Sequence, residues 1–251
     1  MTKSLQGKRV LVVGATGYIG QALTIGIAQA GAEVLMHYHS NGAAVESLCA
    51  QVHKVAGYQP RAFQCDVSDP EAAETLVTSA WRAAGRIDVL IHCVGHAVDN
   101  SIVFLKPEDV ASTLKSNLNT VVNVCEPLSR LMCEHGGGSI VNISSITGLV
   151  GQPMRSLYGA GKAAVISYSK ALARAVADRH VRVNCLAPQV VEGGLADNMK
   201  GMVKALMEEN TPIKAQCQAE DLIEPMLMLA SDGSPFITGE VINITGGLVT
   251  W

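Results

Sequence analysis

A tyrosine and a lysine four residues apart form the pair in this chain that is best suited to proton transfer. Tyr158 and Lys162 lie in a helical pattern, and residues at this spacing share one helix face. A tyrosine pKa is ordinarily about 10, and a neighbouring ammonium lowers it by favouring the phenolate. Ser145 follows an apolar run and can hold a substrate oxygen by hydrogen bond. Alone, Tyr-x-x-x-Lys is weak evidence, because it also describes a surface tyrosine beside a solvated lysine.

A glycine-rich turn near the N-terminus predicts a dinucleotide site. Arg9–Val13 is a β-branched run typical of a buried strand, and Gln21–Ala30 has a helical pattern. Glycines between a strand and a helix let the backbone approach a pyrophosphate, which then lies at the helix N-terminus. The strand and helix supply the context that this motif requires, so a plain tight turn is the weaker interpretation. The predicted cofactor contacts are Gly14, Thr16, Gly17, Tyr18, Ile19 and Gly20.

The end of the second predicted strand, Glu33–His37, favours NADP(H) as the cofactor. A carboxylate about 20 residues past the glycines would hold the ribose 2′-hydroxyl of NAD(H). The chain has His39, Ser40 and Asn41 there, which do not repel a 2′-phosphate and can donate hydrogen bonds to it. NAD(H) stays possible because no arginine or lysine is nearby, and the same residues also suit a simple polar turn.

Strands and helices alternate along the whole chain, which predicts a single doubly wound α/β domain over residues 1–251, with helices on both faces of about seven parallel strands. The other predicted strands are Arg61–Cys65, Ile87–Cys93, Ser139–Ile143, Val181–Leu186 and Gly239–Ile244. The other predicted helices are Val45–Val55, Glu71–Ala84, one or two within Pro107–His135, Tyr158–Asp178 and Ala219–Ser231. Asp69 or Ser68 is expected to cap the third helix. Residues from about 190 to 216 are interpreted as a substrate lid.

Composition excludes several classes of protein. Hydrophobic residues make up 48% of the chain and aromatic residues only 4%, which suits a parallel sheet buried on both faces. A net charge of -3 offers no electrostatic footprint for nucleic acid. The apolar runs are far shorter than the roughly 20 residues that cross a bilayer, and the N-terminus lacks an apolar signal core. The seven cysteines form no Cys-x-x-Cys, so neither metal nor disulfides are indicated and a reduced, cytoplasmic protein is expected.

Four further residues each have two interpretations. Asn117 interrupts a helical pattern, either as a kink or as a site residue. Asp66 follows the third strand, where it can close a turn or contact an adenine amino group. Cys93 is either a reactive thiol or, as favoured here, a buried inert one. His92 is interpreted as a packed histidine rather than a ligand.

With the glycine turn, Asn117, Ser145, Tyr158 and Lys162 in this order, the chain resembles the short-chain dehydrogenase/reductase family over essentially its whole length. It is most similar to the compact single-domain branch that includes 3-oxoacyl-ACP reductases. The resemblance implies that these four residues form the catalytic tetrad and that Ser144 is structural. It also implies further cofactor contacts at Asp66, Val67, Cys93, Gly95, Tyr158, Lys162, Pro188 and Val191.

The function that the resemblance implies is hydride transfer between NADP(H) and a ketone or oxoacyl group, interconverting it with a secondary alcohol. Tyr158 would act as general acid in reduction and general base in oxidation. Ser145 would orient the carbonyl oxygen, Lys162 would lower the tyrosine pKa and contact the ribose, and Asn117 would hold a proton-supplying water. The family also implies a small-molecule carbonyl substrate and a homotetramer, or a homodimer, built through helices near residues 107–135 and 157–178 and the C-terminal strand.

Departures from the usual pattern of the compact branch keep two alternative functions open. The glycines at 14, 17 and 20 have the Gly-x-x-Gly-x-x-Gly spacing of the family's epimerase-like branch, which suggests a redox-neutral epimerase or dehydratase holding NAD. The other alternative is a non-catalytic NADP-binding sensor or scaffold. Gln189 stands after Pro188 where the branch usually has glycine, and Gly193 stands where a threonine is expected.

Overall fold

The computed structural model describes residues 4–97, 100–193, 205 and 209–250 of the chain. Seven strands form one parallel sheet in the order β3-β2-β1-β4-β5-β6-β7. The strands are β1 (Arg9–Val13), β2 (Glu33–Tyr38), β3 (Arg61–Gln64), β4 (Val89–His92), β5 (Gly138–Ile143), β6 (Val181–Pro188) and β7 (Val241–Ile244). The α-helices are α1 (Tyr18–Gln29), α2 (Gly42–Ala56), α3 (Pro70–Ala84), α4 (Pro107–Leu114), α5 (Thr120–Glu134), α6 (Thr147–Val150), α7 (Ser156–Val176) and α9 (Ile223–Ala230).

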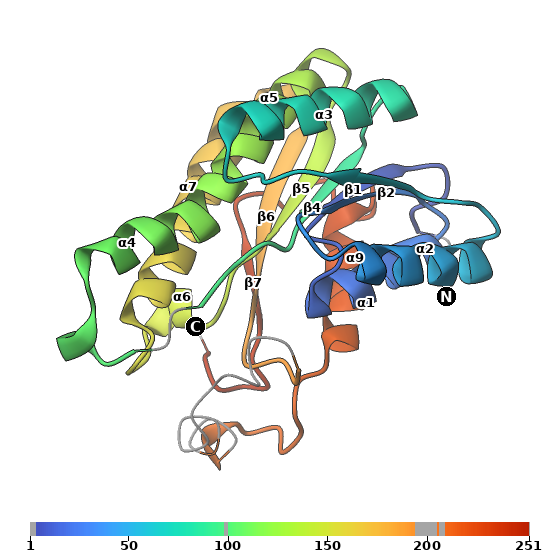
Figure 1. Cartoon of the computed structure of the whole chain (residues 1–251). Helices are drawn as coiled ribbons and strands as arrows, with labels where there is room; N and C mark the ends of the chain where they lie inside the picture. Colours follow the sequence, from blue (N-terminus) through green and yellow to red (C-terminus); the bar gives the residue numbers. More distant parts are fainter. Residues whose placement is uncertain (1–3, 98–99, 194–204, 206–208, 251) are drawn as a thin grey trace.

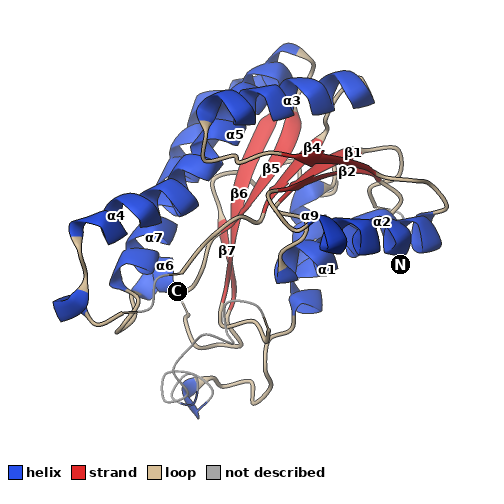
Figure 2. Ribbon diagram, in the orientation of Figure 1, coloured by secondary structure: helices blue, strands red, loops and turns tan. Residues whose placement is uncertain are grey.

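Helices cover both faces of the sheet, as the alternation of strands and helices predicts. Figure 1 shows α1, α2 and α9 on one side, with α3, α5 and α7 on the other. The strands lie between these two helical layers (Figure 2). The strand order reverses between β1 and β4, and ligands of open α/β sheets bind outside the carboxyl ends of the strands at such a switch point.

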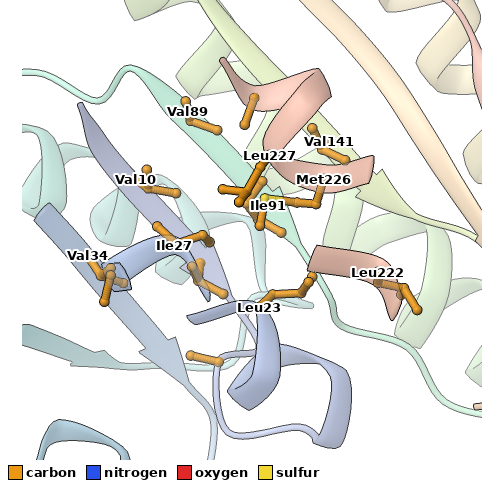
Figure 3. Close-up of a cluster of buried hydrophobic side chains, with 14 of the residues drawn as sticks. Val10, Leu23, Ile27, Val34, Val89, Ile91, Val141, Leu222, Met226 and Leu227 are labelled. Carbon is orange, nitrogen blue, oxygen red and sulfur yellow. The ribbon is translucent and has the colours of Figure 1, made fainter. Parts of the chain in front are cut away.

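Alternate residues of the strands pack into two separate cores, because successive side chains of a strand point to opposite faces. On the α1 side, Val10 of β1 packs with Leu23 and Ile27 of α1 and with Met226 of α9 (Figure 3). On the other side, Leu11 belongs to the cluster formed by α3, α5 and α7. Burial on both faces explains why β1 is a continuous β-branched and aliphatic run.

The third helix begins as the sequence predicts, and the structure decides between its two candidate caps. Asp69 is the N-cap, with its carboxylate Oδ1 accepting hydrogen bonds from the amides of Glu71 at 2.9 Å and Ala72 at 3.0 Å. Pro70 occupies the first helical position, where its missing N–H costs nothing. This cap fixes the turn that carries Asp66 after β3.

The segment predicted as one or two helices within Pro107–His135 contains a local change of helix type. A π-helical segment, η2 (Lys115–Asn119), lies between α4 and α5. A π turn takes in an extra residue and is frequent at functional sites. The predicted Ala219–Ser231 helix also differs, because a 3-10 turn, η5 (Ala219–Leu222), precedes α9. Shorter 3-10 turns are η1 (Ile102–Phe104) and η3 (Ala177–Arg179).

Two other expectations, the substrate lid and the absence of membrane-spanning segments, can be compared only with the described residues. The predicted lid at about 190–216 falls largely on residues 194–204 and 206–208, which lie outside the described part of the chain. Within the described part, no helix combines the length and the apolar character that crossing a membrane requires.

Candidate active site

A cavity of about 300 Å³ lies at the carboxyl ends of the central strands. The glycine turn after β1, the segments after β5 and β6, and residues of α7 all contribute to its lining. Of the residues predicted from the sequence, it is lined by Gly17, Tyr18, Ile19, Gly20, Cys93, Gly95, Ser145, Tyr158, Lys162, Pro188 and Val191. The chain therefore brings the glycine turn and the proposed proton-transfer residues together around one space.

The glycine turn is closely packed and leaves the first amides of α1 open to a ligand. Gly14 has a φ of +81°, and a β-carbon on Gly20 would collide with the carbonyl oxygen of Gly14. Gly17 is the N-cap of α1 and carries no side chain that could bond the first amides of the helix. Amides at a helix N-terminus have no partner within the helix, so they suit a pyrophosphate.

His37, near the end of β2, is hydrogen-bonded to this turn, and the sequence does not predict this role. The Gly14 amide donates to His37 Nδ1 at 3.2 Å, so Nε2 carries the proton and donates to the Cys65 carbonyl at 3.1 Å. Burial lowers the pKa of His37, which favours this neutral form. A histidine inside an apolar strand was the only signal in the sequence, and it gives no indication of its partners.

The predicted adenosine-side residues lie apart from the cavity, at the ends of β2 and β3. His39, Ser40 and Asn41 are exposed, and the Asn41 side chain caps α2 by accepting from the Ala44 amide at 3.0 Å. This confirms the polar-turn interpretation for Asn41. Contact of these residues with a 2′-phosphate stays a prediction.

Asp66 also has the turn role that the sequence allows. Its carboxylate accepts from the Ser68 amide at 2.9 Å, and hydrogen bonds from Ser68 lower the pKa of Asp66. Val67 is buried, and its carbonyl accepts from the Asn123 side chain at 3.1 Å. In the glycine turn, the predicted contact residue Thr16 accepts a hydrogen bond at its carbonyl from the Gln21 side chain at 2.9 Å. An adenine contact at Asp66 or Val67 is untested.

Lys162 is a buried cation at the base of the cavity. Its side chain is 3% exposed, and Nζ donates to the Ile143 carbonyl at 3.0 Å and to the Val94 carbonyl at 3.5 Å. The Lys162 nitrogen lies 5.9 Å from the centre of the Tyr158 ring. Burial lowers the pKa of Lys162 to about 8. The tyrosine and lysine are thus close neighbours in a poorly solvated site.

The two serines after β5 have different surroundings. Ser144 is buried and donates through Oγ to the Lys162 carbonyl at 3.0 Å, which fits a structural role. Ser145 lines the cavity beside Tyr158, and its Oγ accepts from the Thr147 amide at 3.2 Å. Because that bond uses only an acceptor lone pair, the Ser145 hydroxyl proton remains available for a substrate oxygen.

Asn117 lies in the π-helical segment η2, which confirms that it interrupts the helical pattern, whereas its role as a site residue stays a prediction. Its amide nitrogen donates to the His96 carbonyl at 2.8 Å, and its Oδ1 accepts from the His96 amide at 3.2 Å. A β-carbon placed on Gly95 would lie 2.7 Å from Lys162 Nζ and 3.1 Å from Asn117 Oδ1. Asn117 therefore interrupts the helix and also fixes the segment beside Lys162.

The neighbouring thiol and imidazole show no sign of reactivity. Burial raises the pKa of Cys93 to about 12, which supports the inert interpretation. His92 is 1% exposed and lies with Nε2 at 3.0 Å from the Thr120 carbonyl. Burial lowers its pKa to about 3, so it is a neutral, packed side chain. Within the described part of the chain, no group of three or more His, Cys, Asp or Glu could hold a metal ion.

A doubly wound parallel sheet with a glycine turn and a cavity at its switch point defines a dinucleotide-binding protein of the Rossmann type. Comparison with known proteins narrows this class. The family model described as enoyl-(acyl carrier protein) reductase, a short-chain dehydrogenase model, matches residues 14–249. The chain is 34% identical to the 3-oxoacyl-(acyl-carrier-protein) reductase of Thermotoga maritima, over 98% of this chain and 99% of that protein.

Two other similar proteins extend the comparison. L-rhamnose 1-dehydrogenase (NAD(P)(+)) of a Sphingomonas species is 34% identical over 98% of each chain. The structure of a short-chain type dehydrogenase/reductase from Mycobacterium ulcerans has a TM-score of 0.92 and 27% identity, covering 98% of this chain and 90% of that one. The chain belongs to the short-chain dehydrogenase/reductase family. It is an NAD(P)-dependent oxidoreductase that acts on CH–OH and C=O groups.

Proposed function

We propose that this protein is an NADP(H)-dependent reductase that converts a ketone or oxoacyl group into a secondary alcohol, and the reverse. The observation that carries the proposal is that Ser145, Tyr158 and Lys162 line one cavity together with the glycine turn. The lining combines apolar and glycine residues with a few further polar side chains, which suits a small carbonyl compound. These polar side chains belong to Tyr18, Ser144, Thr147, Arg155 and Gln189. Similarity to a 3-oxoacyl-(acyl-carrier-protein) reductase supports the same reaction class.

Each of the predicted catalytic residues has a separate role in the proposed reaction. When bound, the reduced nicotinamide supplies the hydride that the carbonyl carbon receives. Ser145 donates a hydrogen bond to the carbonyl oxygen, and Tyr158 gives that oxygen its proton as general acid. Lys162 stabilises the phenolate that remains and contacts the ribose. Asn117 holds a water through which the proton is resupplied by way of Lys162.

The activity is tested by following cofactor oxidation at 340 nm with NADPH and NADH. The substrates are a panel of ketones, β-ketoesters and an acetoacetyl thioester. We expect substrate-dependent oxidation of NADPH with at least one of them. Saturable binding of both cofactors without oxidation of either would instead support a sensor or a redox-neutral enzyme.

Preference for NADP(H) rests on the exposed, uncharged end of β2. Ser40 follows the strand at the position where a carboxylate would hold the ribose 2′-hydroxyl. We expect Ser40→Asp to weaken NADPH binding by at least about tenfold, because the new charge repels the 2′-phosphate, and to spare NADH. The dissociation constants of both cofactors, measured by fluorescence titration, check this result.

A charge placed within α2, instead of in the turn before it, controls for the general effect of an added carboxylate. Ser47 is exposed on α2, away from the end of β2. Ser47→Asp is expected to leave the ratio of NADPH to NADH affinity unchanged. Equal weakening of both cofactors by Ser40→Asp would contradict the assignment of the 2′-phosphate to this turn.

The proposal includes a homotetramer, with a homodimer as the alternative. Apolar side chains exposed on and before α4 support association of this face: Ile102 at 74%, Val103 at 75% and Phe104 at 68% exposure, with Val110 and Leu114 beyond them. Apolar patches of this kind often mark protein interfaces. Sedimentation of the purified protein measures the oligomeric state directly.

A further inference from the structure

Tyr18 and Gly193 touch each other within the lining of the cavity. A β-carbon placed on Gly193 would lie 2.6 Å from Tyr18 Cε2 and 2.7 Å from Tyr18 Cζ, so the ring rests directly on the glycine. Tyr18 belongs to the glycine turn, whereas Gly193 follows β6. Both residues also line the cavity. The Tyr18–Gly193 contact therefore joins two segments of the cavity lining that are far apart in sequence.

The backbone on each side of this contact is anchored. Tyr18 is the first residue of α1. Just before Gly193, Val191 forms a parallel β-bridge with Cys217, and the Glu192 amide donates to the Cys217 carbonyl at 3.0 Å. The Glu192 carboxylate also accepts from the Gln218 side chain at 2.6 Å. Because both anchors are main-chain structures, rotation of the Tyr18 side chain is the smallest movement that opens the contact.

Tyr18 borders both solvent and the cavity. Tyr18 is 43% exposed although it packs on Gly193 and lines the cavity. The amides of the glycine turn that suit a pyrophosphate lie in the same wall as Tyr18. A dinucleotide that extends from these amides to Tyr158 and Lys162 would run along the part of the cavity lining to which Tyr18 and Gly193 belong.

We infer that Tyr18 is a cofactor-retaining residue, whose ring closes over the bound dinucleotide by packing on Gly193 and must rotate away before the dinucleotide leaves. This inference depends on the cofactor class of the proposed function, but not on the reaction catalysed. The inference concerns the rate at which the dinucleotide dissociates. Most affinity differences between related complexes come from the dissociation rate.

The same contact explains why glycine occupies position 193. Its φ is +87°, a conformation that residues with side chains rarely adopt. Any β-carbon there would also displace the ring, because the closest ring atoms lie well inside van der Waals distance of that position. A threonine, as the family pattern leads one to expect, is incompatible with Tyr18 in this position. Tyr18 and Gly193 therefore act as a matched pair.

The test measures how fast bound NADPH leaves the protein in the absence of any substrate. NADPH fluorescence is followed after rapid mixing with a large excess of NADP⁺. We expect Tyr18→Ala to speed release by about tenfold, since a packed aromatic contact is lost. Tyr18→Phe keeps the ring carbons that touch the glycine and should release NADPH within about twofold of the wild-type rate.

A double-mutant cycle separates the contact from other effects of the two substitutions. Gly193→Ala should also speed release, but it should add little in the Tyr18→Ala background, because no ring remains to be displaced. Gly85→Ala is the matched control: Gly85 has a φ of +80° and open space around its α-carbon. Phe236→Ala controls for loss of an exposed aromatic side chain. Neither control should change the release rate.

Two results would overturn the inference: release from Tyr18→Ala at the wild-type rate, or additive effects of Tyr18→Ala and Gly193→Ala. Either is distinct from failure of the proposed function. A protein that reduces no carbonyl compound can still release NADPH slowly through this contact. Conversely, an active reductase in which Tyr18→Ala has no effect on release would retain its proposed function and lose the retention role.

Discussion

Replacement of Tyr158 by phenylalanine should abolish turnover while leaving NADPH binding nearly intact. The substitution keeps the ring, which is 6% exposed and has the Arg155 guanidinium 5.4 Å from its centre, and removes only the phenol. A positioned general acid contributes about 10²- to 10⁴-fold to the rate, so kcat should fall by at least two orders of magnitude. Steady-state kinetics and an NADPH titration measure the two quantities separately.

The matched control lies on the same helix. Tyr168 of α7 is partly buried, and its hydroxyl donates to Glu126 at 3.4 Å, outside the cavity. Tyr168→Phe makes the same chemical change and should leave kcat close to the wild-type value. Turnover by Tyr158→Phe at a rate similar to this control would remove Tyr158 from the mechanism.

Replacement of Lys162 by methionine should stop turnover and also stabilise the fold. Burial holds the Lys162 pKa at about 8, against 10.5 for an ordinary lysine. Each tenfold change in proton affinity is worth about 1.4 kcal/mol, so the charge costs on the order of 3 kcal/mol at neutral pH. Its hydrogen bonds offset part of this cost. We expect a gain in unfolding free energy on the order of 1–2 kcal/mol.

Urea unfolding and steady-state kinetics of the same sample test both halves of this result. Lys170→Met is the control, because Lys170 is an exposed lysine of α7. It should change neither kcat nor the urea midpoint appreciably. A Lys162→Met protein that is clearly less stable than wild type would show that the ammonium contributes more to folding than its burial costs.

The stability difference should also depend on pH in a defined direction. The unfolded chain holds the Lys162 proton up to about pH 10.5, whereas the folded chain loses it near pH 8. Between these values the unfolded state binds more protons, so this residue makes the wild-type fold more stable as pH rises. The advantage of Lys162→Met should therefore be largest below pH 8 and shrink toward pH 10. An advantage that is constant with pH would contradict the lowered pKa.

Much of the site could be predicted because its parts are local in sequence. The glycine turn is recognisable from a strand, three glycines and a helix within about 20 residues. Tyr158 and Lys162 are paired by helical spacing alone. Boundaries were less predictable: α7 begins two residues before Tyr158, and β6 extends to Pro188. These ends depend on packing and register with neighbouring strands.

The sequence by itself determined the order of strands and helices, the buried character of the sheet and the candidate residues for proton transfer. These features are predictable because hydrophobic periodicity and residue spacing are local properties, set by residues within a short stretch of sequence. Only the tertiary structure showed three contacts. His37 accepts a hydrogen bond from the glycine turn, Asn117 donates one to the His96 backbone, and Tyr18 packs on Gly193. Each of these contacts joins residues that are far apart in sequence. The Asn117 contact also depends on a π-helical segment, which helix propensities do not predict. These contacts exist only once the sheet brings the strand ends together.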